Sequence, residues 1–521
     1  MTSPDQTLVI QLARFGDFLQ TTPLLAALKQ HRPDGRLSVL VDAAQASLAK
    51  GNPDVDEVLS VDLAAMRNAA GDGTRRLSRR LSGVESELVC LKGRTFDRVV
   101  NLNTSRVAAL ISELAVAARR DGPRLGADRK RLHPAPWAVF IMNLMRRRRL
   151  IRFNLVDLLT SYADVEARPT DRLVYPLGKE DANQGTVRAT KPGDGPLIGF
   201  QLGSRHPSRQ WPPEHFSRLA RDLIVRDRAR VLLLGTEAER PLGQAVIGHP
   251  VLSIPEAAGR ITNLMGRTTI GELAGVLSGL DLLLTTDTGT MHLASAVGTP
   301  ILALFIGPAL CHETGPYGAG HVIVQVVTEC SPCTESEADC GDYPCRGLIT
   351  PDLALSLARW RLDGRRAQWP TLPEVDPRVR LMISEFDDFG VVYRPLVPWS
   401  PDPSDLLALA YREAGREFIR PAYRPSVPSR LYGTGIEVGP WLETMARWAH
   451  RTPAPNTPCP ADLEPLKRIL VGLAAARRAE AGRLILGTMT RILVMASHGD
   501  APETNFSAAR LEPARRTGGA E

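Results

Sequence analysis

The sequence has few aromatic residues and lacks long apolar runs. Aromatic residues make up 5% of its 521 residues, and no run reaches the roughly 18 apolar residues of a membrane-spanning helix. Seven cysteines, an odd number, do not form the dense pattern of a secreted disulfide-rich protein. The opening stretch, MTSPDQTLVIQLA, lacks the basic region and cleavage site of a signal peptide. These features predict a cytoplasmic protein.

The chain also lacks a strong excess of one charge. Its net charge is +7 and its isoelectric point is near 9.1, which indicates a mildly basic surface that suits an anionic substrate or lipid. This charge is too diffuse to indicate nucleic-acid binding. Hydrophobic residues at 43% and charged residues at 23% describe a globular protein with room for two or three domains.

The most informative stretch is 280–300, LDLLLTTDTGTMHLASAVGTP. A leucine-rich run predicts a buried strand, a polar turn of small residues follows, and a helix then begins. Such a unit presents unpaired backbone N–H groups and the positive end of a helix dipole, which suit a phosphate. Gly289 would let a phosphate approach, and Thr288 and Thr290 add hydroxyl donors. An ordinary capped helix in an α/β sheet would give the same pattern.

Strands and helices alternate before and after this stretch. Residues 7–12 predict a strand that runs into Gly16 and Asp17 at the start of a helix, and residues 197–201 open a second such series. Alternation of this kind predicts doubly wound parallel sheets, with ligands at the carboxyl ends of the strands. We take the polar region 171–195 as the linker. Further strands are expected at 37–42, 56–62, 97–103, 230–235 and 300–305.

Two other clusters stand out. Cys330, Cys333, Cys340 and Cys345 follow the spacing C-x2-C-x6-C-x4-C. Four thiolates can surround zinc or an iron–sulfur cluster, although reduced cysteines or a local disulfide pair would fit equally. The apolar stretch 135–145 leads into four arginines, 146–149, which suits either an anionic membrane surface or a core helix with a solvated basic end.

We predict four regions from these patterns. Residues 1–180 form a first Rossmann-like domain, and residues 190–360 form a second one that carries the cysteine loop 330–345. Residues 361–500, with helical stretches at 404–418, 441–450 and 462–495, form a mostly helical extension of unknown role. Residues 501–521 form a disordered tail.

In these features the chain resembles family 9 glycosyltransferases, the bacterial heptosyltransferases of lipopolysaccharide core assembly. The resemblance covers roughly residues 7–355. The chain departs from the family in two respects: it has arginine at position 209, where the family often has lysine, and it has a long C-terminal tail. The resemblance implies the two-domain GT-B fold, with the acceptor on the first domain and the sugar nucleotide on the second. The matching residues are Gly16-Asp17, Arg209-x-Trp211-Pro212, Asp287-Thr288-Gly289-x-x-His292, Gly315-Pro316-Tyr317-Gly318 and the CSPC loop.

The resemblance assigns roles to these residues. Asp17 is the general base that accepts the proton of the acceptor hydroxyl. Arg209 and the helix start at Thr288-Gly289 neutralise the pyrophosphate. Asp287 binds sugar hydroxyls or fixes the turn, and His292 faces the same cleft. Glu239 or Glu237 would hold a ribose hydroxyl, and Gly266 and Thr268 would flank the base. The structural alternatives are a surface acid for Asp17, a helix cap for Asp287 and a core histidine for His292.

The expected activity is inverting transfer of heptose from ADP-heptose to a lipopolysaccharide-core or related glycan acceptor. Transfer should require no cofactor, and a metal at the cysteine loop would be structural. The expected partners are the nucleotide-sugar donor, a lipid-linked or glycan acceptor, and the inner face of the membrane. The alternatives are another nucleotide sugar, a protein acceptor, or a non-catalytic assembly protein that binds sugar nucleotides.

Overall fold

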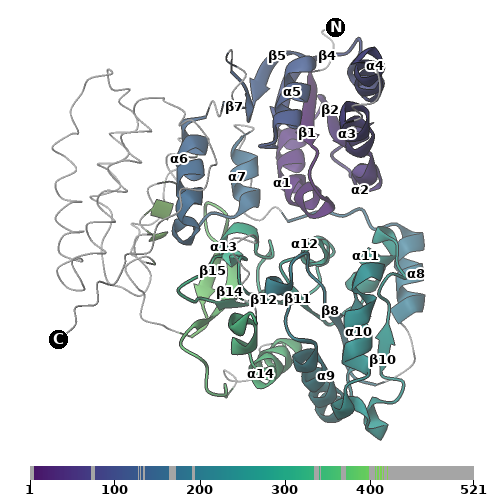
Figure 1. Ribbon diagram of the computed structural model, residues 1–521, viewed down its shortest axis with the longest axis vertical. Helices are drawn as coiled ribbons and strands as arrows, with labels where there is room; N and C mark the ends of the chain where they lie inside the picture. The colour runs from purple at the N-terminus through teal and green to yellow at the C-terminus, as the bar shows by residue number, and fades with distance from the viewer. Residues whose placement is uncertain are drawn as a thin grey trace, which may run out of the picture. The chain divides into compact units, whose positions relative to one another are not determined.

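The computed structural model of the protein describes most of the chain before residue 398 (Figure 1). Residues 1–451 form one compact unit and residues 452–521 another, and the second unit lies outside the described part. The described residues are 5–71, 77–126, 128, 131–132, 135–162, 172–189, 194–333, 340, 342–364, 371–397, 405, 408–409, 411–412, 415 and 419.

The first half of the described chain contains a five-stranded parallel sheet in the order β3-β2-β1-β4-β5. Its central strand β1 is apolar because helices cover both faces of the sheet. The strands are β1 (Gln6–Gln11), β2 (Arg36–Asp42), β3 (Glu57–Val61), β4 (Thr95–Asn101) and β5 (Val116–Asp121). The helices between them are α1 (Phe15–His31), α2 (Ala46–Ala49), α3 (Leu63–Gly71), α4 (Leu77–Glu87) and α5 (Arg106–Leu114).

The second sheet has eight strands in the order β10-β9-β8-β11-β12-β13-β14-β15. The first six run parallel, and β14 and β15 are antiparallel additions at one edge. The strands are β8 (Leu197–Gln201), β9 (Arg230–Leu234), β10 (Ile261–Asn263), β11 (Leu282–Thr286), β12 (Ile301–Phe305), β13 (Val322–Val326), β14 (Val379–Phe386) and β15 (Val391–Pro395). The helices are α9 (Pro213–Asp227), α10 (Arg240–Ile247), α11 (Ile270–Ser278), α12 (Gly289–Ala296), α13 (Cys311–Thr314) and α14 (Pro351–Leu362).

Both sheets reverse their strand order at one point, between β1 and β4 in the first and between β8 and β11 in the second. A doubly wound sheet binds its ligand outside the carboxyl ends of the strands at this point. The expectation of two parallel α/β domains is therefore confirmed, and the positions of their ligand sites follow from the strand order.

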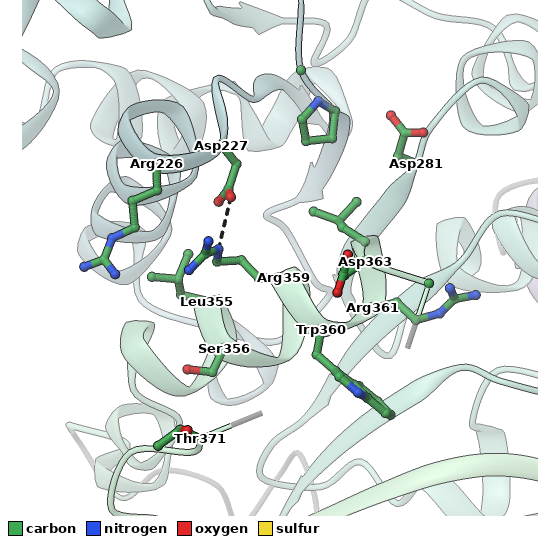
Figure 2. Close-up of a pocket in the computed structure, with 14 residues that line it drawn as sticks. Arg226, Asp227, Asp281, Leu355, Ser356, Arg359, Trp360, Arg361, Asp363 and Thr371 are labelled. Atoms are coloured by element: carbon green, nitrogen blue, oxygen red, sulfur yellow. Dashed lines mark hydrogen bonds and ion pairs between the residues drawn. The ribbon is translucent and has the colours of Figure 1, made fainter. Parts of the chain in front are cut away.

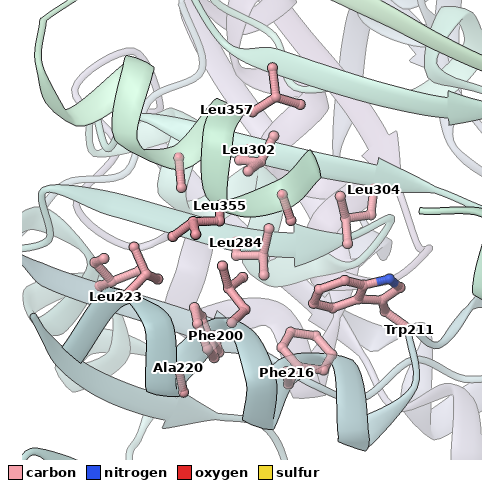
Figure 3. Packing of buried hydrophobic residues seen from close by; sticks show 14 of the residues in the cluster. Phe200, Trp211, Phe216, Ala220, Leu223, Leu284, Leu302, Leu304, Leu355 and Leu357 are labelled. Carbon is pink, nitrogen blue, oxygen red and sulfur yellow. The ribbon is translucent and has the colours of Figure 1, made fainter. Parts of the chain in front are cut away.

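An aromatic and aliphatic core fixes the second sheet beneath its helices (Figure 3). Trp211 lies just before α9, is 1% exposed, and packs edge-on against Phe216 with ring centroids 4.8 Å apart. Its indole N–H donates to the backbone carbonyl of Ile349, at 2.9 Å. The tryptophan that the sequence places beside Arg209 is thus a packing residue, and it anchors the loop that carries this arginine.

Two local expectations differ from the structure. The polar stretch taken as a linker contains α8 (Lys179–Ala189), which packs against α11 because Gly185 and Gly275 let the two backbones approach closely. Residues 379–395, placed in the helical extension, form the hairpin β14–β15 and complete the second sheet.

The remaining part of the extension is only sparsely described. The described residues among 405–419 are helical, in line with the helix expected at 404–418. The helices expected at 441–450 and 462–495 and the tail 501–521 lie outside the described residues.

Before α8, the described residues between the two sheets form the two-stranded ribbon β6 (Arg124–Leu125) and β7 (Arg131–Leu132), the helix α6 (Pro136–Leu144), the short helix η3 (Met145–Leu150) and the helix α7 (Leu155–Ser161). Asp157 on α7 is buried and accepts hydrogen bonds from the Tyr317 hydroxyl, at 2.9 Å, and from the backbone N–H of Val391, at 3.2 Å. This segment therefore connects the first half of the chain to loops of the second.

Candidate active site

Two strand-to-helix turns, one from each half, meet at the centre of the site. The β1–α1 turn carries Gly16 and Asp17, and the β11–α12 turn carries Asp287, Thr288 and Gly289. A Cβ atom on Gly16 would lie only 3.2 Å from the Gly289 Cα and 3.2 Å from the His292 Cδ2, and a Cβ on Gly289 would collide with the ring of Phe15. Glycine at both positions therefore allows the two turns to approach one another.

Asp17 lies in the first turn of α1, where its Oδ2 accepts a hydrogen bond from the backbone N–H of Arg14, at 3.0 Å. Burial raises the pKa of this carboxyl to about 6, against the weaker lowering effect of the backbone hydrogen bond. A partly buried carboxylate with a pKa near neutrality suits a general base, because it is deprotonated at pH 7 yet holds a proton better than an ordinary aspartate. An ordinary surface acid would not have this environment.

Asp287 is buried beside a cation. Arg209, in the short helix η4 (Pro207–Arg209), donates from Nη1 to Asp287 Oδ2 at 2.9 Å, and the Thr314 hydroxyl bonds to the same carboxylate. Burial raises the pKa of Asp287, and the charges of Arg209 and Arg148 oppose that shift. The carboxylate is therefore used to hold a guanidinium and a hydroxyl, not to cap a helix.

The N-terminus of α12 is left without a side-chain cap. Thr288 is the residue at the cap position, but its hydroxyl forms no cap hydrogen bond and lies instead 3.3 Å from the Thr285 hydroxyl. The N–H groups of the first turn thus keep their capacity for an anion at the carboxyl edge of β11. The arrangement fits the phosphate site predicted for Thr288 and Gly289.

His292, one turn into α12, is 5% exposed. Burial lowers its pKa to about 4, so the imidazole is neutral at physiological pH. Its Nδ1 is buried and finds no hydrogen-bond partner within the described part of the chain. The ring lies against Gly16 of the first half, so His292 does face the junction expected for it.

The residues expected to hold the nucleoside gather at the ends of β8, β9 and β10. Glu239 packs over Gly203 and accepts a hydrogen bond from the Thr236 backbone N–H, at 2.8 Å. Glu237 packs over Gly266, whose φ of +70° favours glycine, and pairs with Arg240 at 2.7 Å. Thr268 follows β10 and is partly exposed. These positions share the carboxyl edge of the second sheet, and their contacts to a nucleoside stay a prediction.

Sequence reasoning missed one ion pair beside this site. Arg148 donates from Nε and Nη2 to the carboxylate of Glu313 on α13, with Nε–Oε1 at 3.0 Å, and from Nη2 to the Pro308 carbonyl at 2.8 Å. Arg149 donates to the backbone carbonyls of Thr328, Glu329 and Ser331. No sequence signal identifies these partners, because they lie some 160 to 180 residues further along the chain.

The arginine run 146–149 therefore does not form one solvated basic face. Arg148 and Arg149 contact the second half of the chain, whereas Arg146 and Arg147 are exposed. Within the part of the chain that the structure describes, no helix is long and apolar enough to cross a membrane.

The cysteine loop is described only in part. Cys330 and Cys340 are exposed, Cys333 and Cys345 are half-buried, and all four are free thiols. Burial raises the pKa of Cys345, and the thiols of Cys333, Cys340 and Cys330 add to that shift. Among the described residues, no group of three or more histidine, cysteine, aspartate or glutamate side chains is arranged to hold a metal ion.

A cavity of about 1080 Å³ lies at the opposite edge of the second sheet (Figure 2). Pro196, just before β8, and Asp281, just before β11, line it at the amino ends of the strands, and Arg359 pairs with Asp227 across it at 3.0 Å. The β11–α12 turn lies at the carboxyl ends of the strands, so this cavity does not belong to the candidate active site.

Several known proteins are similar to this chain. The family model of glycosyltransferase family 9 (heptosyltransferase) matches residues 89–343. The lipooligosaccharide heptosyltransferase 2 of Haemophilus influenzae is 30% identical over 166 residues, which cover 31% of this chain and 46% of that protein. The lipopolysaccharide heptosyltransferase 2 of Escherichia coli is 24% identical over 357 residues, 67% of this chain and 96% of that protein.

A solved structure supports the fold. The family 9 glycosyl transferase from Veillonella parvula superimposes with a TM-score of 0.56 at 20% identity, covering 70% of this chain and 99% of that one. The two sheets form the two-domain GT-B fold, and the family match and the relatives identify the protein as a glycosyltransferase. Within that class the chain is heptosyltransferase-like and resembles glycosyltransferase family 9.

Proposed function

We propose that the protein is an inverting glycosyltransferase that transfers heptose from ADP-heptose to a lipopolysaccharide-core or related glycan acceptor. The observation that carries this proposal is the meeting of Asp17 from the first half with the turn at Asp287-Thr288-Gly289 from the second. The names of the relatives in Haemophilus influenzae and Escherichia coli support heptose as the sugar.

The chemistry follows from these groups. An acceptor hydroxyl oxygen forms a bond to the anomeric carbon while the bond from that carbon to the diphosphate oxygen breaks, and Asp17 takes the hydroxyl proton. The leaving diphosphate gains negative charge, which the guanidinium of Arg209 and the N–H groups at the start of α12 stabilise. Protein groups of this kind can neutralise a diphosphate, so we propose that transfer requires no cofactor.

A panel of nucleotide sugars tests the proposal. The protein should bind or slowly hydrolyse ADP-heptose in preference to UDP-, GDP- and other ADP-sugars, measured by calorimetry and by release of the nucleoside diphosphate. A clear preference for a uridine donor would show that the transferred sugar is not heptose. The assignment of the fold and of the phosphate-binding turn would stand. Transfer to a purified lipopolysaccharide core, and its absence with protein acceptors, would then establish the acceptor.

We also propose a cytoplasmic location with contact to the inner face of the membrane. The six cysteines in the described part of the chain are free, as expected in a reducing compartment. The contact surface fits α5 better than the arginine run, because Val107, Leu110 and Leu114 form an exposed apolar stripe beside the exposed Arg106. The helix α5 follows β4 at the same sheet edge as Asp17, where a lipid-linked acceptor would be needed.

A further inference from the structure

The ion pair between Arg148 and Glu313 joins the two halves of the chain next to the turn of Asp287. Glu313 is the penultimate residue of α13, and Thr314 is the last. Glu313 holds Arg148, and Thr314 bonds to Asp287, which in turn holds Arg209. Arg148 and Arg209 are thus connected through adjacent residues of one short helix.

The orientation of Arg148 is fixed by several bonds. Its Nε and Nη2 face the two oxygens of Glu313, and Nη2 also donates to the Pro308 carbonyl. Among the described residues its Nη1 forms no hydrogen bond, and the side chain keeps 25% of its surface exposed. One edge of a positioned guanidinium therefore stays available to a ligand.

A carboxylate also holds the guanidinium of Arg209. A largely buried carboxylate, Asp287, holds its Nη1 at 2.9 Å, and the arginine side chain is 23% exposed. The charges of the two pairs influence one another, since Arg148 opposes the rise in the pKa of Asp287 and Arg209 opposes that of Glu313. Two guanidiniums held by carboxylates, one from each half, thus contact the loops that follow β11 and β12, next to the uncapped start of α12.

We propose that Arg148 is a second phosphate-binding residue, which contacts the distal phosphate of the donor's diphosphate across from Arg209, and that Glu313 positions it. This proposal rests on the proposed function, because it takes the donor to be a nucleoside diphosphate sugar. The diphosphate is then held between a cation of the acceptor half and a cation of the donor half. Binding of the donor thereby stabilises the approach of Asp17 to the turn at Gly289.

Calorimetric titration with nucleoside mono- and diphosphates tests this role, using adenine or uracil nucleotides according to which base the parent protein binds. Arg148→Ala should weaken the diphosphate about tenfold or more, since a hydrogen bond to a charged group contributes roughly 1.5–3 kcal/mol. The monophosphate should bind as before, because it lacks the distal phosphate. Arg148→Lys should give an intermediate loss, since it keeps the charge and loses the planar fork.

Arg146→Ala is the matched control, because Arg146 belongs to the same arginine run and is exposed; it should leave both affinities unchanged. Removing Arg148 alone leaves a buried carboxylate without its cation, so Arg148→Gln combined with Glu313→Gln provides a neutral pair for the case in which the single variant does not fold. The double variant should show the same selective loss of diphosphate affinity.

The outcomes distinguish a failure of the proposed function from a failure of the role of Arg148 alone. If the parent binds mono- and diphosphate equally, both the phosphate turn of the proposed function and the role of Arg148 are wrong. If the parent prefers the diphosphate and the Arg148 variants keep that preference in full, the ion pair only joins the two halves and the role of Arg148 alone is wrong.

Discussion

At the scale of single residues, Asp17 has the clearest chemical consequence. If it is the base, Asp17→Asn should keep donor binding and lower the transfer rate by about a hundredfold to ten-thousandfold, the usual contribution of a general base. Because its pKa is raised to about 6, the parent rate should climb as pH increases through 6 and then level off. Initial rates between pH 5 and 8 measure both effects, and a variant as fast as the parent would place the base elsewhere.

The same carboxyl should also affect stability. Between its ordinary pKa of 3.8 and the folded value of about 6, the folded state binds more protons than the unfolded state. Stability therefore falls as pH rises through this window. Asp17→Asn removes the buried charge. Above pH 6 the free energy of unfolding of the variant should therefore be at least that of the parent, and higher by up to about 3 kcal/mol. Denaturant titrations at pH 4 and pH 7 compare the two.

Arg209 should contribute to both binding and folding. Arg209→Ala is expected to erase most of the preference for diphosphate over monophosphate, and to cost about 3 kcal/mol because Asp287 stays buried without its cation. Arg209→Lys should be mild, since it keeps the charge. Arg205→Ala, an exposed arginine of the same loop, is the control. Calorimetry measures the nucleotide affinities, and thermal unfolding measures stability. If Arg209→Ala matched the control in both, this role of Arg209 would be wrong.

The sequence predicts where a residue lies in the fold when its motif stands between a strand and a helix. Asp17 and Asp287 each follow a leucine- or valine-rich strand and precede a helix, so the sequence alone places them at a sheet edge. The partners of Arg148 and Arg149 could not be found this way, because a run of arginines resembles a solvated surface until its distant carbonyl and carboxylate acceptors are known. Nor does the sequence show that Trp211 acts through packing.

At the scale of secondary-structure elements, α5 has an exposed apolar face that needs a partner. Its Leu110 and Leu114 are 50% and 60% exposed, and Val116 at the start of the edge strand β5 is 59% exposed. If this face lies on an anionic bilayer, Leu110→Gln with Leu114→Gln should weaken binding to phosphatidylglycerol vesicles at least tenfold, since each buried leucine contributes roughly 1.5–3 kcal/mol.

The control for α5 is Val225→Gln, an exposed apolar residue on α9 in the second half, which should bind vesicles like the parent. Cosedimentation with vesicles measures all three proteins. If the parent and the α5 variant bind vesicles equally, another surface of the protein contacts the membrane. If the parent does not bind vesicles, the proposed membrane contact is wrong.

The cysteine loop allows a direct chemical test. We expect Cys330→Ser with Cys333→Ser to lower the melting temperature more than the transfer rate, because the described contacts of the loop are to Arg149 rather than to Asp17. Elemental analysis of the purified parent decides whether a metal is present. Zinc or iron at one equivalent, lost in the double variant, would establish a structural metal at the four thiols.

Element boundaries were predicted well for strands buried on both faces and poorly for elements that depend on distant contacts. The strand 197–201 was expected at the residues where it occurs. The helix α8 was missed because its residues are polar, and it gains stability from the close approach of Gly185 to Gly275. The hairpin β14–β15 was missed because its pairing partner, β13, lies more than 50 residues earlier.

At the scale of the described chain, the two halves share contacts at several places besides the site. Asn154 donates to the Tyr393 hydroxyl at 3.0 Å, and Phe153 packs edge-on against Phe389 with ring centroids 5.6 Å apart. These contacts lie on the segment that leads into α7. The segment therefore couples the first half of the chain to the added hairpin, so the position of the first sheet depends on residues beyond the family-like region.

That added hairpin determines where the chain can be divided. A protein shortened to end after α14 would keep every motif that resembles the family, yet it would expose the apolar edge of β13 and remove the hairpin partners of Phe153, Asn154 and Asp157. An unpaired apolar edge favours aggregation. The catalytic region is therefore not an independent module to which a tail was appended, and its inheritance, exchange or recombinant production has to include the hairpin.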